Sequence, residues 1–248
     1  CCPGDGFVAQ DMKSSNSPSP LGRWLKRLAL GLLALILLYQ LWFFGWVLWW
    51  SWKNPDTTRF MDIRLGELQL KNPQARLQKE WISYAGISNH LKRAVIASED
   101  DLFLQHNGFD WKGIQKAMEK NQQRGRIVAG GSTITQQLAK NLFLTPDKTP
   151  WRKAQEAVIT VMIETLWSKQ RTLEIYLNVI EWGNGVFGAE AAARHYYGVS
   201  ASRLSAEQAA RLAGMIPSPR YYDRNRSSAY LSTRSNLILG RMNSAAIP

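Results

Sequence analysis

Four polar segments of the sequence carry side chains that could perform chemistry. The first contains Glu99 and Asp100, which closely follow an apolar run at residues 94–97. A carboxylate at the end of such a run is partly desolvated, which makes it a better general base. If the helix continues, Glu99, Phe103 and His106 share one face, because positions three or four apart are neighbours on a helix. A solvated acidic helix end beside a structural histidine is the alternative.

The second segment, at residues 130–141, reads GGSTITQQLAKN. Its two glycines allow unusual backbone angles, and Ser132 is a natural helix N-cap. On the helix that follows, we expect Thr133, Gln137 and Lys140 to line one face. A glycine-rich loop that leads into a helix can bind phosphate, although the Gly-Lys-Ser/Thr of a Walker loop is missing. An ordinary capped amphipathic helix is the alternative.

The third segment places Arg152 one helical turn before Glu156, so a surface ion pair is its simplest interpretation. In the fourth, at residues 172–192, small residues permit close helix packing, which favours a role in the core. The histidines are too far apart in sequence to indicate a metal site. Both cysteines, Cys1 and Cys2, lie at the extreme N-terminus, which excludes a thiol nucleophile or a Cys-ligated zinc site from the folded part.

The charge of the chain is strongly basic, with 31 Lys and Arg against 19 Asp and Glu, a formal net charge of +12. An excess of this kind indicates a polyanionic neighbour such as nucleic acid, anionic lipid or a phosphorylated substrate. Charge alone does not choose among them, and simple solubility is the alternative.

An apolar stretch at residues 28–52 carries no formal charge. At about 1.5 Å per residue it is long enough to cross a hydrocarbon core of about 30 Å. Tryptophans crowd its C-terminal end, where an interfacial aromatic belt belongs, and Arg23, Lys26 and Arg27 precede it, as does Lys13. We therefore expect an uncleaved signal-anchor helix with a cytoplasmic N-terminus. A cleavable signal peptide would have a shorter apolar region that ends in small residues.

The rest of the chain suggests a simple organisation. We expect a cytoplasmic tail over residues 1–27, in which 1–11 precede the first methionine as an extension and 13–22 are disordered. A linker with one short element follows over 53–80, and a mainly α domain occupies 81–248. Its expected helices cover residues 133–142, 152–178, 189–197 and 206–215.

Taken together, the four segments resemble the glycosyltransferase domain of class A penicillin-binding proteins, and still more its monofunctional relatives, the biosynthetic peptidoglycan transglycosylases. The resemblance covers roughly residues 81–220 and rests on EDxxFxxHxGFD, GGSTITQQLAKN, RKxxE and ExYLNxxxxGxxxxGxxxAA, in that order. A fifth family motif is similar to LSAEQAARLAGMIPSP at residues 204–219. Asp101 and the segment after Tyr221 depart from the usual pattern.

The resemblance implies a mainly α, lysozyme-like fold with two lobes. The smaller lobe would come from about residues 111–130 and dip into the membrane, with Trp111, Ile114 and Met118 against lipid. The implied donor is a growing glycan on undecaprenyl diphosphate, and the implied acceptor is lipid II. No cofactor is required, although the chemistry is compatible with a divalent cation at the diphosphate.

The resemblance also implies roles for single residues. Glu99 would be the general base that deprotonates the acceptor 4-hydroxyl, which attacks the donor anomeric carbon with inversion and gives a β-1,4 bond. Lys140 and Arg152 match positions that stabilise the leaving diphosphate, and Glu156 matches a second essential carboxylate. The matching cleft-lining positions are Asp100, Phe103, His106, Thr133, Gln137 and Asn141.

Two other functions remain open at this stage. A lytic transglycosylase or lysozyme would use the glutamate first as an acid on a finished glycan, and an inactive membrane-anchored scaffold would need none of the four charged groups. For the enzyme we expect a single-pass protein of a bacterial inner membrane with a periplasmic catalytic domain. We expect lipid contact and no nucleic acid, with cell-wall synthesis or division proteins as candidate partners.

Overall fold

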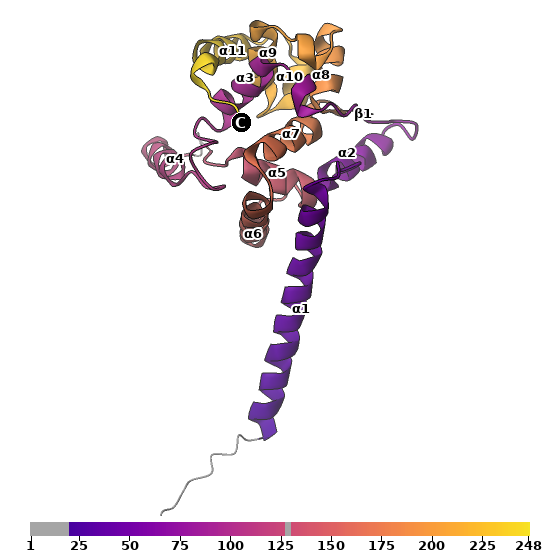
Figure 1. The fold of residues 1–248 in the computed structure, drawn as a ribbon, viewed down its shortest axis with the longest axis vertical. Coiled ribbons are helices and arrows are strands. Elements are labelled where there is room, and N and C mark those ends of the chain that lie inside the picture. Colours follow the sequence, from indigo (N-terminus) through magenta and orange to yellow (C-terminus); the bar gives the residue numbers. More distant parts are fainter. Residues whose placement is uncertain (1–19, 127–129) are drawn as a thin grey trace, which may run out of the picture. The chain divides into compact units, whose positions relative to one another are not determined.

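The computed structural model describes residues 20–126 and 130–248, apart from the side chains of residues 20 and 22. The described chain is mainly helical, as predicted (Figure 1). It divides into two compact units, residues 1–42 and residues 43–248. The predicted extension at residues 1–11 and residues 13–19 of the predicted disordered segment lie outside the described residues, whereas residues 20–22 of that segment are helical and not disordered.

Helix α1 (Pro20–Trp50) is the expected apolar helix. Within the described residues it is the one helix that is long and apolar enough to cross a membrane, over Arg23–Trp50. It begins before the predicted start at residue 28, so the end of the predicted tail is helical. Proline in the first helical turn lacks an N–H that would be unpaired there anyway, and the basic residues that follow are good helix formers.

The last residues of α1 belong to the second unit, and they pack within it. The rings of Phe43 and Trp50 contact Phe143, with centroid distances of 5.4 and 5.1 Å. Arg171 donates through Nε and Nη2 to the carbonyl oxygen of Trp50, at 3.1 and 2.9 Å. Carbonyl groups at a helix C-terminus have no partner within the helix, so the guanidinium group of Arg171 caps the C-terminus of α1.

The region predicted as a linker, residues 53–80, is packed into the second unit. Its short element is helix α2 (Arg59–Gln69), which begins where the Thr58 side chain accepts a hydrogen bond from the Met61 N–H. Strand β1 (Gln78–Lys79) follows and pairs in parallel with β3 (Val186–Phe187), which is antiparallel to β2 (Glu181–Gly183). Strand β1, which is distant in sequence from the hairpin of β2 and β3, thus forms one edge of the sheet beside β3.

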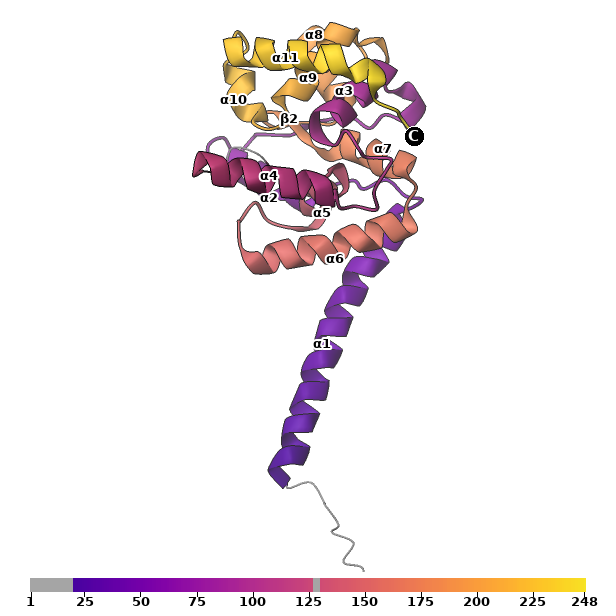
Figure 2. The same cartoon turned by 90° about the vertical axis from the view of Figure 1, so that its left-hand side faces the viewer.

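The helices of the second unit surround a buried centre, helix α7 (Lys169–Val179). Leu173, Ile175, Tyr176 and Leu177 of this helix are all fully buried, so the C-terminal half of α7 exposes little beyond part of Glu174. In both views α7 lies between α5 and α6 on one side and α3, α8, α9 and α11 on the other (Figure 1, Figure 2). The surrounding helices are α3 (Asn89–Glu99), α4 (Trp111–Arg124), α5 (Ile134–Phe143), α6 (Pro150–Leu166), α8 (Ala189–Tyr197), α9 (Ala206–Met215), α10 (Pro219–Arg224) and α11 (Ala229–Arg241).

The predicted helices 189–197 and 206–215 are confirmed, and the predicted helix 133–142 is displaced by one residue. The single helix predicted over 152–178 is wrong, because the chain leaves the helical conformation at Trp167 and Ser168. Ser168 is an N-cap that accepts from the Arg171 N–H at 3.1 Å, and it starts a new helix in a new direction.

The segment predicted to form a membrane-dipping lobe contains α4. Trp111 and Met118 are exposed on this helix, and Phe109 stacks on Trp111 with ring centroids 5.4 Å apart. Residues 127–129 of the same segment lie outside the described residues. The exposed apolar side chains are consistent with the prediction, and contact with lipid remains a prediction.

Candidate active site

Glu99 is the last residue of α3, and its side chain lines a cavity of about 180 Å³. The apolar face of α3 is buried in the core, so the helix delivers the carboxylate to the cavity with only 9 % of the side chain exposed. Ser98 Oγ donates to Oε1 at 2.9 Å, and Gln137 Nε2 donates to Oε2 at 3.0 Å. The partial desolvation that the sequence predicted for Glu99 is confirmed.

A hydrogen-bonded chain connects Glu99 to the core of the domain. The Tyr176 hydroxyl donates to Gln137 Oε1 at 2.8 Å, so the NH₂ group of the amide must point toward Glu99. Burial raises the pKa of Tyr176 well above its ordinary value, and the carboxylates of Glu99 and Asp100 raise it further. The hydroxyl therefore stays protonated and fixes the amide of Gln137 in one orientation.

Arg234 of α11 is a further neighbour of Glu99 that sequence reasoning missed. Its Nη2 lies 3.3 Å from Glu99 Oε1 and donates to Ser98 Oγ at 3.1 Å. The two residues of the ion pair are 135 positions apart. No sequence signal pointed to this pair, because Arg234 lies on α11, well beyond the fifth motif, and no local spacing connects the two residues.

The prediction that Glu99, Phe103 and His106 share a helical face is wrong, because α3 ends at Glu99. Asp100 instead organises the loop that follows. Its Oδ1 lies 2.8 Å from His106 Nε2, and its Oδ2 accepts from the Ile134 N–H at 3.0 Å. His106 Nδ1 accepts from a backbone N–H, so Nε2 carries the proton and donates to Asp100.

The two aromatic residues predicted to line the cleft lie behind it. Phe103 is fully buried, and the ammonium group of Lys169 lies over its ring, 4.6 Å from the centroid. The side chain of His106 is 9 % exposed and is engaged with Asp100. Of the residues predicted in this motif, Glu99 and Asp100 line the cavity, whereas Phe103 and His106 support the loop.

The glycine-rich loop forms another wall of the same cavity, with contributions from Gly130, Gly131, Ser132 and Thr133. The N-cap of α5 is Thr133 and not Ser132 as predicted, because Thr133 forms a reciprocal capping box with Gln136. Ser132 is thereby left outside the helix, where it accepts a hydrogen bond from Lys153 Nζ at 3.3 Å.

Glu156 is enclosed by cations. Its side chain is 3 % exposed, Arg152 Nη1 donates to Oε2 at 2.6 Å, and Lys153 Nζ donates to Oε1. The predicted surface ion pair is therefore a buried carboxylate with two cationic partners. Within the described residues, the buried Nε of Arg152 has no hydrogen-bond partner, which leaves one donor of the guanidinium unused.

Lys140 lies in the electrostatic field of both carboxylates. Burial lowers its pKa from the ordinary 10.5, and the charges of Arg152 and Lys153 lower it further. Glu156 and Glu99 act in the opposite direction. Glu99 and Glu156 are thus both close enough to Lys140 to influence its ammonium group.

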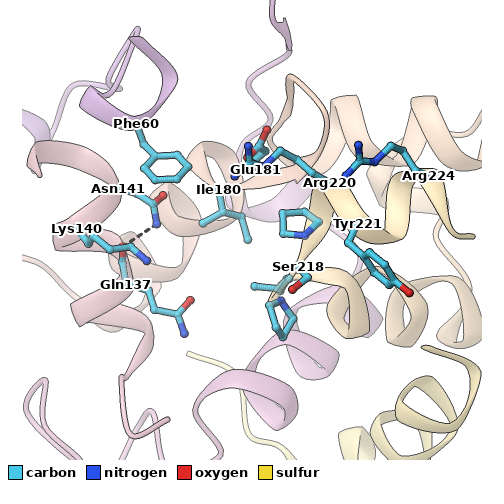
Figure 3. A pocket seen from close by; sticks show the side chains of 13 residues that line it. Phe60, Gln137, Lys140, Asn141, Ile180, Glu181, Ser218, Arg220, Tyr221 and Arg224 are labelled. Atoms are coloured by element: carbon cyan, nitrogen blue, oxygen red, sulfur yellow. Dashed lines mark hydrogen bonds and ion pairs between the residues drawn. The ribbon is translucent and has the colours of Figure 1, made fainter. Parts of the chain in front are cut away.

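A larger cavity of about 430 Å³ begins on the other side of Gln137. Gln137, Lys140 and Asn141 of α5 line one side, and Asn141 Nδ2 donates to the Gln137 carbonyl oxygen at 2.7 Å. Figure 3 shows these side chains facing Arg220 and Tyr221 of α10 across the hollow. Gln137 therefore contacts the carboxylate of Glu99 and also borders a space large enough for a sugar.

A family model described as "Transglycosylase" matches residues 66–243. The chain belongs to the transglycosylase family. The match includes every predicted site residue, and it begins inside α2, which agrees with the packing of that helix into the second unit.

Transglycosylases from several bacteria are similar to this chain over nearly its whole length. The protein of Dechloromonas aromatica (strain RCB) is 66 % identical over 228 residues, which are 92 % of this chain and 99 % of the relative. Those of Laribacter hongkongensis (strain HLHK9) and Nitrosospira multiformis are 62 % and 61 % identical over 226 residues, 91 % of this chain and 99 % and 98 % of the relatives. Each relative is named a biosynthetic peptidoglycan transglycosylase, in agreement with the resemblance found in the sequence.

Proposed function

We propose that this transglycosylase polymerises peptidoglycan, transferring a growing glycan on undecaprenyl diphosphate to lipid II. The observation that carries the proposal is the pairing of Glu99 with Gln137 on α5, the helix that also bears Lys140. Helix α5 thus carries both the amide that holds the proposed base and the cation Lys140, beside a cavity of about 430 Å³. The names of the relatives support the same substrate class.

In the proposed reaction, the oxygen of the acceptor 4-hydroxyl forms a bond to the donor anomeric carbon while its proton passes to Glu99. The bond between that carbon and the diphosphate oxygen breaks, and the electron pair leaves with the diphosphate. The configuration inverts and the product bond is β-1,4. Glu99 suits the base because Gln137, Ser98 and Arg234 hold its carboxylate in one orientation. A positioned general base contributes about 10²–10⁴-fold to a rate.

The leaving diphosphate needs positive charge where its own charge develops. We assign this role to Lys140 and Arg152, a point charge and a forked donor. The unused Nε of Arg152 supports this assignment, since it has no partner among the described residues. Glu156 is a positioning residue in this scheme, because its carboxylate is occupied by Arg152 and Lys153.

We also propose that α1 anchors the enzyme in a bacterial inner membrane with the N-terminus in the cytoplasm. Arg23, Lys26 and Arg27 at its start support this orientation through the positive-inside rule. A reporter that is active only outside the cytoplasm, fused after Pro248, should then be active. A protein that is soluble, or shortened to begin near residue 53, would contradict the anchor.

Incubation of the purified full-length protein with labelled lipid II tests the proposed function. We expect a ladder of glycan products on gels, which a β-1,4-specific muramidase degrades and which Glu99→Gln fails to make. Anhydro-sugar products from isolated sacculi would instead show a lytic enzyme, and the absence of both products would favour a scaffold. Repeating the assay with EDTA tests whether a divalent cation assists at the diphosphate.

A further inference from the structure

A second cavity of about 490 Å³ adjoins the cavity shown in Figure 3. The two cavities share the side chains of Arg220 and Arg224 on α10. The second cavity extends from these arginines to α2, which contributes Arg64, Glu67 and Leu68. The hollow beside Lys140 thus continues away from the proposed reacting centre along a path that α10 borders on one side.

The path has an excess of positive charge. Its lining contains five cations, Arg64, Lys71, Lys140, Arg220 and Arg224, and two carboxylates, Glu67 and Glu181. Five minus two leaves a net charge of +3. No described lining residue other than these two glutamates carries negative charge, so the path favours an anionic ligand.

The two carboxylates are already occupied by one arginine. Arg64, which is 6 % exposed, donates from Nε to Glu181 at 2.8 Å and from Nη1 to Glu67. Arg220 forms longer ion pairs with the same acids, 3.8 Å from Glu181 and 3.7 Å from Glu67, and its side chain stays 50 % exposed. Arg224 forms no ion pair or side-chain hydrogen bond with any residue that the structure describes. The guanidinium group of Arg224 and the exposed part of Arg220 can therefore contact a ligand.

The remaining lining suits a sugar. Ile180, Ile216 and Pro217 provide apolar surface, and Tyr221, which also lines the cavity, is 52 % exposed. An aromatic ring can pack against the C–H face of a pyranose, while Asn141 offers an amide to its hydroxyl and acetamido groups. Carbohydrate and carboxylate contacts are thus combined on one surface.

We propose that Arg220 and Arg224 form a subsite for the peptide-stem carboxylates of the growing glycan, beyond the sugar that reacts. This inference rests on the proposed function. Peptidoglycan strands carry short peptides on alternating sugars, and these peptides end in carboxylates, which arginine binds through paired hydrogen bonds. The subsite holds the strand after each transfer, so it contributes to substrate affinity and product length and takes no part in the chemical step.

The test compares two substrates in the full-length enzyme, lipid II with free stem carboxylates and lipid II with those carboxylates amidated. The variant is the double substitution Arg220→Gln with Arg224→Gln, and the matched control is Arg203→Gln, an exposed arginine outside both cavities. For exposed charge pairs of this kind, we expect the double variant to raise KM for the free-carboxylate substrate by about threefold to tenfold. Its kcat should be unchanged, its products shorter, and its activity on the amidated substrate equal to that of the wild type.

Three results separate the alternatives. An equal loss on both substrates would show that the arginines serve the diphosphate common to both and would overturn the subsite. An unchanged KM on both substrates would overturn it as well. If the wild type makes no polymer from either substrate, the proposed function itself fails, which is distinguishable from both results.

Discussion

The carboxylates of Glu99 and Glu156 act on the same lysine, Lys140, but their surroundings differ. Glu99 lines a cavity and is held by two neutral donors and by one arginine at 3.3 Å. Glu156 is buried, and two cations occupy its two oxygens. A carboxylate that accepts a proton from substrate must be reachable and needs an oxygen that no close cation occupies, such as Oε2 of Glu99, which among the described residues accepts only from the neutral amide of Gln137. The difference supports the proposed roles, chemistry for Glu99 and positioning for Glu156.

Replacement of Glu99 should have the largest effect. Glu99→Gln keeps the shape and the hydrogen bond to Ser98 but accepts no proton at neutral pH. We expect the polymerisation rate on lipid II to fall by about 10²–10⁴-fold. Circular dichroism should show an unchanged fold. A rate within about threefold of the wild type would remove Glu99 from the role of base, because general base catalysis contributes far more than that.

Replacement of the cations Lys140 and Arg152 should weaken the binding of the donor. Each charge-assisted contact to a diphosphate contributes about 1.5–3 kcal/mol, so Lys140→Ala and Arg152→Ala should weaken binding by about tenfold to 150-fold. Arg152→Lys should stay impaired, because it keeps the charge and loses the fork. Calorimetry with a phosphoglycolipid mimic of the donor measures these affinities, and Glu99→Gln is the control that should bind more nearly as the wild type does. If Lys140→Ala, Arg152→Ala and Glu99→Gln all bind the mimic with wild-type affinity, the two cations do not contact the diphosphate and the proposed division of roles is wrong.

The hydrogen-bonded support of Glu99 should have a smaller effect. Tyr176→Phe removes the hydroxyl that orients the Gln137 amide. A hydrogen bond of this type contributes about 0.5–1.5 kcal/mol, so kcat should fall by about twofold to tenfold while KM changes little. A purely structural role would lower the amount of folded enzyme instead. Active-site titration with the donor mimic distinguishes the two cases.

The smallest expected effect is a shift of the pH dependence. Because burial lowers the pKa of Lys140, its ammonium group loses its proton at a lower pH than an exposed lysine does. A reaction that needs this charge should therefore decline as pH rises, beginning below 10.5. Lys140→Arg keeps its charge to higher pH, so its alkaline decline should move upward even if the maximal rate is lower. Identical alkaline declines in both enzymes would show that Lys140 does not titrate in the reaction.

Local sequence signals predicted those parts of the fold that depend on local interactions. Helix 206–215 was predicted with its correct ends, because its N-cap serine and capping box lie next to its apolar face. The break at Ser168 was not predicted, because apolar residues continue at helical spacing across it and this pattern outweighs the weaker signal of the N-cap serine. The pairing of Glu99 with Arg234 depends on the packing of α3 and α11 near α9, and no spacing along the chain reveals it.

The candidate site shows the same difference between features that local sequence predicts and features that depend on long-range packing. The motifs predicted Glu99, Gln137, Lys140, Arg152 and Glu156 as site residues, and the structure brings these residues to one region around α5 and α6. The depth of each side chain was not predictable from the motifs. Phe103 and His106 belong to the same motif as Glu99, but the end of α3 directs them into the supporting loop.

Chemical rescue tests the central claim most directly. Glu99→Ala leaves space at the cavity for a small carboxylate, so formate and acetate should restore part of the polymerisation rate. For a general base the restored rate should rise with the basicity of the added carboxylate. In Glu156→Ala, where the missing group only pairs with Arg152 and Lys153, any small anion that restores activity should do so without regard to basicity. Rescue of Glu99→Ala that is absent, or that does not depend on basicity, would contradict the assignment of Glu99 as the base.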